Sequence, residues 1–228
     1  MTNKGNLVVI TAGGTGLIGH ELIKQLLNET PIEHVYALSR KDLPFEHEKL
    51  QVIKDPNLEI KHWDDSLMTP EYGFISLGTT KKQAGSNHAL EKVDFELVCK
   101  VAQQMKIIGV KRLCVVSSLG ASAQSPSHYL RCKGKMELAL SDMGFEKLVF
   151  VRPGPLVGIR DIPRTDERLV QSILGVLKPL MLGPLKRFIP IRAEKVAQAM
   201  QYALLEKTRF QIEILDSIDM LSLINKYR

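Results

Sequence analysis

A tyrosine and a lysine stand four residues apart in the segment His-Tyr-Leu-Arg-Cys-Lys at residues 128–133. The segment lies in a predicted helix, residues 127–142, so Tyr129 and Lys133 share one helical face with Cβ atoms about 5–6 Å apart. An ammonium group near a phenol stabilises the phenolate and lowers the pKa of the phenol toward the range useful for proton transfer. We therefore predict an acid/base pair; a half-buried tyrosine beside a solvated lysine is the structural alternative.

Two adjacent serines, Ser117 and Ser118, stand at the end of a predicted buried strand, residues 112–117. Ligands of open parallel sheets bind outside the carboxyl ends of the strands. A hydroxyl group here is therefore placed to orient a substrate carbonyl. The residues themselves do not decide which of the two serines does so.

A glycine-rich loop follows the first predicted strand, residues 6–10, and leads into a predicted helix, residues 17–27. Gly13 permits a tight turn, Gly16 a close approach of the backbone to a pyrophosphate, and Gly19 close packing of helix on strand. The amides at the start of the helix then carry the negative charge. We predict a dinucleotide site, with a ligand-free turn as the alternative. The predicted cofactor contacts in this loop are Gly13, Gly14, Thr15, Gly16, Leu17 and Ile18.

The second predicted strand, residues 34–38, is followed by Ser39, Arg40 and Lys41, with Asp42 one step later. An NAD site usually has an acid near this point, which bonds the ribose 2′-hydroxyl. A carboxylate would repel a 2′-phosphate, whereas Arg40 would bind it as a planar fork. We therefore predict NADP(H) rather than NAD, with Ser39 and Arg40 as contacts. A surface basic pair is the alternative.

Short apolar runs alternate with stretches of helical apolar spacing, which predicts an α/β fold with a doubly wound parallel sheet. Six of the eleven prolines fall within residues 153–190, a composition typical of loops and broken helices. We predict one domain over residues 1–228 with a small substrate-side insert at about 154–192. The expected strands are residues 6–10, 34–38, 50–53, 74–77, 112–117, 147–152 and 210–215, and the expected helices are 17–27, 89–105, 127–142, 193–205 and 218–227.

The chain has 228 residues, a net charge of +6 and 44% hydrophobic residues, the balance of a globular protein with a sizeable core. The absence of a long basic run, with only 6% aromatic residues, argues against nucleic-acid binding. No apolar run reaches the roughly 18 residues of a membrane span. The three scattered cysteines argue against disulfides and a metal site. The apolar run at the N-terminus is too short for a signal peptide, so we expect a cytoplasmic protein.

The very apolar segment 169–182 lies among arginines and lysines. We expect it to pack over the substrate crevice, with an interfacial or partner-binding helix as the alternative. Pro179 interrupts the helical pattern, which weakens the membrane version of that alternative. A homodimer that pairs the helices at 89–105 and 127–142 is also left open.

Several motifs together resemble the short-chain dehydrogenase/reductase superfamily in its extended and atypical branch. They are the glycine loop, the serine pair, and Tyr129 with Lys133. A narrower similarity, to the Tat-interacting-protein oxidoreductase group and its bacterial relatives, is carried by Phe74–Ser86, Val93-Asp94, Val116–Ala121 and Arg152-Pro153-Gly154.

This resemblance implies a Rossmann-like sheet that binds NADP(H), with Tyr129 as acid/base and Lys133 holding the nicotinamide ribose. It favours Ser118 over Ser117 as the serine that orients the substrate. It also implies that Leu77, Gly78 and Thr79 pass over the cofactor's ribose and phosphates, and that Pro153 lies near the nicotinamide. No acid is assigned to the adenine; Asp55, Asp64 and Asp65 are the candidates.

The first functional hypothesis is an NADP(H)-dependent oxidoreductase that transfers hydride between the nicotinamide and a small carbonyl or alcohol substrate. The second is an NADPH-binding sensor that acts through protein contacts, because cofactor binding does not require turnover. The third is a nucleotide-sugar epimerase or dehydratase, which we rank last because few residues remain after Pro153 to form a nucleotide-sugar domain.

Overall fold

The computed structural model describes residues 6–64, 66–157, 188–206 and 210–227. Its main sheet has seven strands in the order β3-β2-β1-β4-β5-β6-β9, and each neighbouring pair runs parallel. This order confirms the predicted Rossmann-like α/β fold. The strands are β1 (Leu7–Ala12), β2 (Ile32–Ser39), β3 (Leu50–Lys54), β4 (Tyr72–Ile75), β5 (Arg112–Val116), β6 (Lys147–Arg152) and β9 (Ile212–Asp216).

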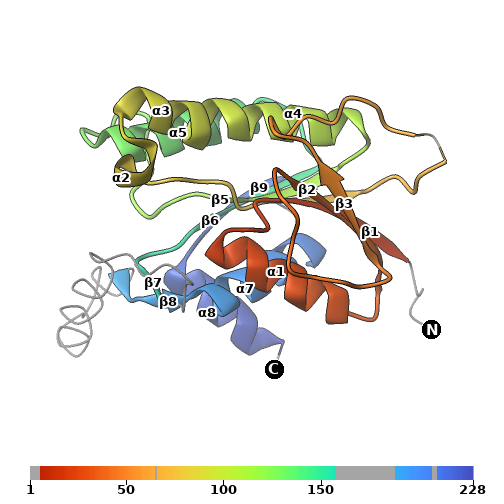
Figure 1. Ribbon diagram of the computed structural model, residues 1–228. Helices are drawn as coiled ribbons and strands as arrows, with labels where there is room; N and C mark the ends of the chain where they lie inside the picture. The colour runs from red at the N-terminus through yellow and green to blue at the C-terminus, as the bar shows by residue number, and fades with distance from the viewer. Residues whose placement is uncertain (1–5, 65, 158–187, 207–209, 228) are drawn as a thin grey trace.

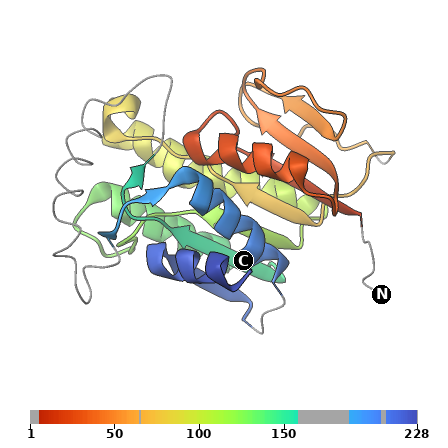
Figure 2. The ribbon, with the colours of Figure 1, turned by 90° about the horizontal axis from the view of Figure 1, so that it is seen from below.

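Helices cover both faces of this sheet, as Figure 1 shows. Seen from below, the first helix and the last two lie in front of the strands (Figure 2). These three are α1 (Leu17–Asn28), α7 (Ala193–Leu205) and α8 (Ser217–Lys226). The opposite face carries α3 (Asn87–Glu91), α4 (Val98–Ile107) and α5 (His128–Ser141), with the short α2 (Lys81–Ala84) beside them.

The two helical layers give the protein two apolar cores, one on each face of the sheet. In β1, Val9 packs into the core under α1 and α7, whereas Val8 and Ile10 pack into the core under α4 and α5. A strand covered on both sides needs apolar residues at successive positions, not at alternate ones. This requirement explains why β1 reads as an unbroken apolar run.

Several element boundaries differ from the sequence expectation. The single helix expected at 89–105 is divided, because a π-helical turn, η1 (Lys92–Leu97), separates α3 from α4. The strand expected at 74–77 is β4 and ends at Ile75, since Ser76 turns to lie against Gly13. The strand expected at 210–215 begins at Ile212, and Phe210 is exposed.

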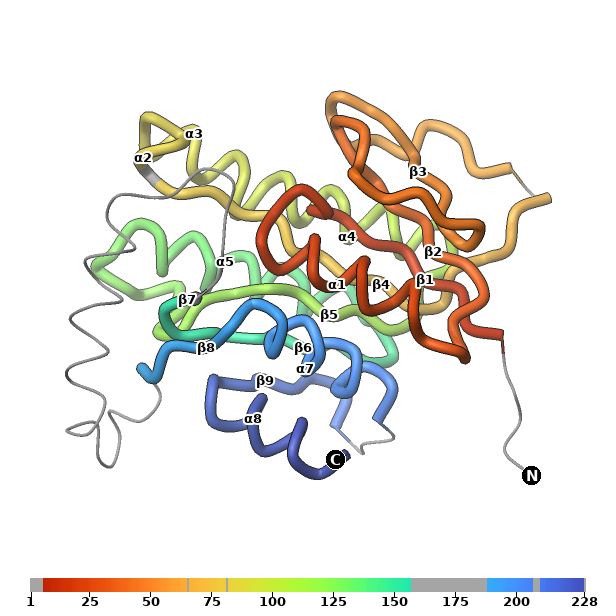
Figure 3. The backbone as a smooth tube through the Cα atoms, turned by 60° about the horizontal axis from the view of Figure 1, so that its bottom comes forward, coloured from red at the N-terminus to blue at the C-terminus, as the bar shows by residue number. Residues whose placement is uncertain are grey.

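The predicted insert at 154–192 is bracketed by a second, two-stranded sheet. β7 (Leu156–Val157) pairs in parallel with β8 (Ile191–Arg192). Residues 158–187 lie outside the described residues, and so does the apolar segment 169–182. The extent of the single domain therefore stays a prediction. Figure 3 shows β7 and β8 at the end of the molecule that α2 and α3 also border.

Candidate functional site

A cleft of about 940 Å³ opens at the carboxyl ends of the strands. It lies beside the point between β1 and β4 where the strand order reverses, the usual ligand position in such sheets. Most of the predicted site residues line it, although they come from widely separated parts of the chain. These are Gly13, Thr15, Gly16, Leu17, Ile18, Arg40, Leu77, Gly78, Thr79, Ser117, Ser118, Tyr129, Lys133 and Pro153.

Two predicted contacts, Gly14 and Ser39, are absent from the lining of this cleft. A Cβ atom on Gly14 would point toward the side chains of Ile23 and Leu43, so this glycine serves packing behind the loop. Ser39 is buried, and its hydroxyl donates to the carbonyl of Lys41 at 2.7 Å. Ser39 therefore shapes the turn that carries Arg40.

The glycine loop is packed too tightly for side chains at two of its three regular positions. Gly13 has φ +101°, a left-handed conformation that favours glycine. A Cβ on Gly19 would lie 2.1 Å from the Gly13 carbonyl oxygen, which explains the close approach of α1 to the loop. Gly16 is roomier, because its Cβ would lie 3.3 Å from that same oxygen.

The N-terminus of α1 is open toward a ligand. Gly16 occupies the N-cap position, no side chain caps the helix, and its first turn contains no acidic residue. The first amides of a helix have no partners within it, and the helix dipole makes this end positive. Thr15, Gly16 and Leu17 all line the cleft here, so the loop suits an anionic group such as a pyrophosphate.

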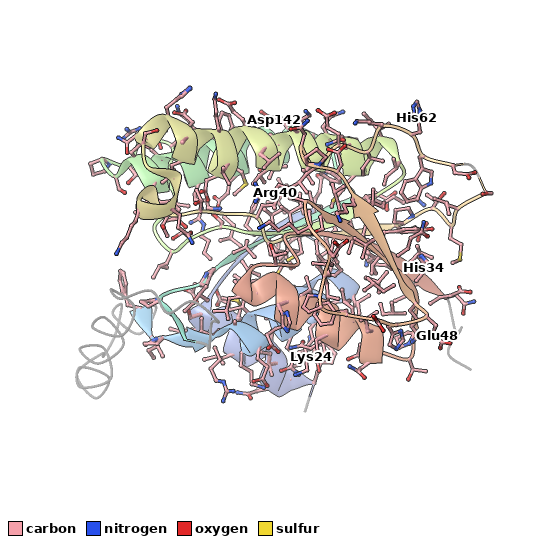
Figure 4. All side chains as sticks on the ribbon, viewed as in Figure 1. Lys24, His34, Arg40, Glu48, His62 and Asp142 are labelled. Carbon is pink, nitrogen blue, oxygen red and sulfur yellow. The ribbon has the colours of Figure 1, made fainter. Side chains whose placement is uncertain are left out.

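Arg40 reaches the cleft from the end of β2, between the α1 layer and the α4 layer (Figure 4). Asp42, the nearest acid in sequence, instead pairs with Lys54 at 2.7 Å. In the described part of the chain no ion pair engages Arg40. Its guanidinium is thus available to an anionic group at this end of the cleft.

Tyr129 and Lys133 lie on α5, as their spacing predicts, and both line the cleft. Lys133 is buried, and its Nζ lies 2.8 Å from Oδ1 of Asp94 and 3.3 Å from the carbonyl oxygen of Val116. Burial by itself lowers the pKa of Lys133, but its electrostatic interactions with Tyr129 and Asp94 outweigh this effect and raise the pKa above the usual lysine value. Lys133 is therefore a cation at neutral pH.

Asp94 is a site residue to which the sequence pattern assigned no role. It lies in the π-helical turn η1 and is fully buried, and its Oδ2 accepts a hydrogen bond of 2.9 Å from the Thr79 amide. A Cβ on Gly78 would lie 3.2 Å from Oδ1, so Gly78 leaves room for the carboxylate. One acid thus joins the loop after β4 to the lysine on α5. Wide π-helical turns of this kind are frequent at functional sites.

The two serines have different surroundings. Ser117 is buried, and its hydroxyl donates to Oε1 of Glu137 at 2.5 Å. Glu137 is also paired with Arg152, whose pKa it raises through this hydrogen bond. Ser118 is half-buried on the cleft, with a single weak contact of 3.5 Å to the Leu119 carbonyl oxygen. Ser118 is thus the serine with a hydroxyl available to a ligand.

Pro153 and Gly154 complete the wall of the cleft after β6. The carbonyl of Pro153 accepts a bond from the Leu119 amide, and the Gly154 amide donates to the hydroxyl of buried Ser217. Of the acids considered for the adenine, Asp55 and Asp64 do not line the cleft. Asp55 accepts the amides of Asn57 and Glu59 in its own turn, Asp64 accepts the amide of Ser66, and Asp65 lies outside the described residues.

Sequence comparison identifies relatives that span most of the chain. The HIM1 family model matches residues 72–182. Protein FMP52 of Meyerozyma guilliermondii is 32% identical over 202 residues, which cover 86% of this chain and 85% of that protein. Protein HTATIP2 of Rattus norvegicus is 30% identical over 175 residues, or 75% and 72% of the two chains. The chain belongs to the family of FMP52 and HTATIP2. The predicted resemblance to the Tat-interacting-protein group is thereby confirmed.

Solved structures share the fold of this protein, which is a relative of HTATIP2 and FMP52. A UDP-glucose 4-epimerase of Thermus thermophilus in complex with NAD superposes with a TM-score of 0.66 at 15% identity, over 96% of this chain and 83% of that one. WbmG of Bordetella bronchiseptica, also in complex with NAD, has a TM-score of 0.66 at 14% identity, over 100% and 80% of the two chains. At this identity the likeness concerns the fold.

The expectation of a cytoplasmic protein is contradicted by the relatives. The FMP52 proteins of several fungi, among them Meyerozyma guilliermondii and Saccharomyces cerevisiae, are named as mitochondrial. The short apolar N-terminal run was therefore too weak a basis for that prediction. Among the described residues of this family member, no helix is both long and apolar enough to cross a membrane.

Proposed function

We propose that this protein is an NADP(H)-dependent oxidoreductase of the short-chain dehydrogenase type, acting on a small carbonyl or alcohol. One observation carries the proposal: a single cleft is lined at one part by the glycine loop and Arg40, and at another by Ser118, Tyr129 and Lys133. The first group suits a dinucleotide, and the second suits proton transfer. Their presence in one cleft of about 940 Å³ would place a substrate beside the cofactor.

Several parts of the cleft lining suit a nicotinamide dinucleotide. The uncapped N-terminus of α1 and the absence of a side chain at Gly16 suit the pyrophosphate. Leu77, Gly78 and Thr79 would lie along the ribose and phosphates, and Pro153 near the nicotinamide. Arg40 would bind a 2′-phosphate, because its charge has no partner in the described chain and the nearby Asp42 is taken by Lys54.

The reaction needs a hydride and a proton, and the protein's own residues would handle the proton. When bound, NADPH supplies the hydride to the carbonyl carbon and NADP⁺ accepts it in the reverse direction. The Tyr129 hydroxyl would give its proton to the carbonyl oxygen as the alcohol forms, and would recover it in the reverse reaction. Ser118 would donate a hydrogen bond to that oxygen.

Lys133 would act on this chemistry by its charge and its position. An ammonium group beside a phenol stabilises the negative charge that the phenol gains when it gives up its proton. The buried contact with Asp94 holds the lysine in place, and its raised pKa keeps it charged over the whole physiological range. Lys133 also lines the cleft where the nicotinamide ribose would lie.

The cofactor can be tested by titration of the pure protein with NADPH and NADH, followed by nicotinamide fluorescence. We expect tighter binding of NADPH. Arg40→Ala should weaken NADPH binding by about tenfold to hundredfold, which is the contribution of charge-assisted hydrogen bonds to a phosphate, and should leave NADH binding unchanged. Lys41→Ala, a change at an exposed neighbour that does not line the cleft, is the matched control. Binding of neither nucleotide would overturn the proposal.

Turnover can be tested with a panel of aldehydes, ketones and quinones, with NADPH oxidation as the readout. Tyr129→Phe should bind NADPH but lose most of the rate, whereas Tyr227→Phe, at an exposed tyrosine near the C-terminus, should be unaffected. Full activity of Tyr129→Phe would remove Tyr129 from the mechanism. Tight NADPH binding without any turnover would favour an NADPH sensor instead.

A further inference from the structure

Three side chains outside the cleft bring three different metal-binding atoms together. Glu91 comes from α3, and His128 and Cys132 come from α5, where they stand four residues apart on one face. The Glu91 carboxylate, the His128 imidazole and the Cys132 sulfur all lie within 4.8 Å of one another. None of the three lines the cleft, so the cluster is separate from the proposed cofactor site.

The spacing of these atoms is close to that of a tetrahedral metal site. Ligands about 2.0–2.3 Å from a tetrahedral zinc ion lie about 3.3–3.8 Å from one another. Nε2 of His128 lies 3.4 Å from Sγ of Cys132 and 3.8 Å from Oε2 of Glu91. These two edges already have the required length, and a small shift of the Glu91 carboxylate would adjust the third.

Burial and access also suit a bound ion. Cys132 is buried at 1% exposure, which fixes one ligand in the interior. The side chains of His128 and Glu91 are 25% and 27% exposed, so an ion and a water molecule can reach the cluster from solvent. The carbonyl oxygen of Asn87 also lies near the cluster, 3.1 Å from Nε2 of His128. Three protein ligands and a fourth position for water or this carbonyl complete the set that zinc requires.

We propose that Glu91, His128 and Cys132 form a site for a borderline-soft divalent cation of the zinc class, which joins α3 to α5. The nitrogen, sulfur and oxygen ligands favour zinc or cobalt over magnesium and calcium, which prefer oxygen ligands alone. On binding, the Cys132 thiol would release its proton to solvent, and the thiolate, the neutral imidazole and the carboxylate would hold the ion. The sequence predicts no such site, because the ligands come from two helices.

Neighbouring basic side chains set the conditions for binding. Lys135 Nζ lies 3.2 Å from Oε1 of Glu91, so Glu91 would bind the ion through Oε2 alone. Arg131 approaches Nδ1 of His128 at 3.4 Å and would have to turn from it, because Nδ1 carries the proton when Nε2 binds a metal. Arg131 would still donate to the Ser125 carbonyl at 2.6 Å.

The test is a Co²⁺ titration of the reduced full-length protein, without a tag and stripped of metal by a chelator. We expect a near-ultraviolet thiolate-to-cobalt charge-transfer band that saturates at one ion per chain and is abolished by Zn²⁺. Zn²⁺ should also raise the melting temperature, because a ligand that binds the folded state stabilises it. Absence of the cobalt band from the wild-type protein would overturn the proposal.

Variants decide which residues hold the ion. Cys132→Ser should abolish the charge-transfer band. His128→Gln should weaken Zn²⁺ by at least the roughly 10–100-fold that the loss of an outer-shell partner causes. The matched controls are Cys99→Ser, at a half-buried cysteine on α4, and His88→Gln, at an exposed histidine on α3, which should both bind as the wild type does. His128→Gln decides the question if the buried Cys132→Ser change prevents folding. Equal binding by His128→Gln and wild type, or loss of the band in Cys99→Ser, would refute the assignment.

Discussion

Lys133 and Asp94 form an ion pair of 2.8 Å in which neither side chain is more than 2% exposed. The pair joins α5 to the π-helical turn η1, and the Thr79 amide bonds the second oxygen of the same carboxylate. A buried charge is tolerated only with a partner and further hydrogen bonds. The candidate site is therefore built around a lysine whose position depends on an acid from another helix.

Asp94→Asn should destabilise the protein strongly. The change keeps the shape of the side chain but leaves the buried Lys133 ammonium without its partner, a loss of about 3–5 kcal/mol of unfolding free energy. Urea unfolding at pH 7 measures the effect. The matched control is Asp42→Asn, which breaks an exposed pair with Lys54 and should leave the unfolding midpoint nearly unchanged. Equal midpoints for Asp94→Asn and wild type would show that the buried pair does not stabilise the fold.

The raised pKa of Lys133 predicts how stability changes at alkaline pH. The folded protein holds the Lys133 proton more tightly than the unfolded chain does. The contribution of this charged lysine to the unfolding free energy is therefore fully present below the ordinary lysine pKa of 10.5. It is lost as the pH rises through the higher folded value. Between these two pKa values the unfolding free energy of the wild type should fall by about 1.4 kcal/mol per pH unit more than that of Lys133→Met, because one additional proton leaves on unfolding.

Unfolding free energies at a series of pH values above 10.5 measure this slope. Lys135→Met, at an exposed lysine on the same helix, should retain the wild-type slope. Identical slopes for the wild type and Lys133→Met would contradict a raised pKa of Lys133 in the folded protein.

Local spacing was sufficient to predict several parts of the site. Gly13, Gly16 and Gly19 follow a buried strand and open an amphipathic helix, and Tyr129 and Lys133 stand one turn apart. Each of these features depends on residues that are close together in the sequence, so the spacing of residue types is enough to predict it. The parallel sheet then brings the loops after its strands to one edge, which is why most of the predicted residues line a single cleft.

Contacts between distant segments could not be predicted in this way. Asp94 falls on the same buried helical face as Leu90, Val98 and Val101. An acid on an otherwise apolar face was the one sign in the sequence that this residue has a special role. Its partner Lys133 lies on another helix. The π-helical turn that contains Asp94 has no distinctive amino-acid composition. Gly14, a predicted cofactor contact, is absent from the cleft lining, and a Cβ atom on it would meet the side chains of Ile23 and Leu43.

Substitution of two glycines in the loop by alanine should have different effects: Gly19→Ala should affect folding, and Gly16→Ala should affect cofactor binding. Gly19→Ala would place a Cβ atom 2.1 Å from the Gly13 carbonyl oxygen, and should lower the unfolding free energy by about 1–3 kcal/mol or more. Gly16→Ala would place its Cβ 3.3 Å from that oxygen, a tight contact without overlap, in an extended conformation that alanine adopts, so it should cost much less unfolding free energy than Gly19→Ala.

Gly16→Ala should instead weaken NADPH by about tenfold, equivalent to about 1.4 kcal/mol, because the added methyl group would enter the proposed pyrophosphate position. Urea unfolding and NADPH fluorescence titration, measured on both variants, test the two effects. Wild-type NADPH affinity in a folded Gly16→Ala protein would argue against a pyrophosphate at the start of α1.

The two serines should respond in opposite ways to removal of the hydroxyl. Ser117→Ala would take a hydrogen bond from buried Glu137, which also pairs with Arg152, and should lower the unfolding free energy by about 1–3 kcal/mol. Ser118 makes no comparable internal bond, so Ser118→Ala should leave stability unchanged. If Ser118 bonds the substrate oxygen, its loss should reduce kcat/KM by about 100-fold, the effect of removing one such donor, while NADPH binding is retained. A large loss of activity in a stable Ser117→Ala protein, with Ser118→Ala fully active, would reverse the two roles.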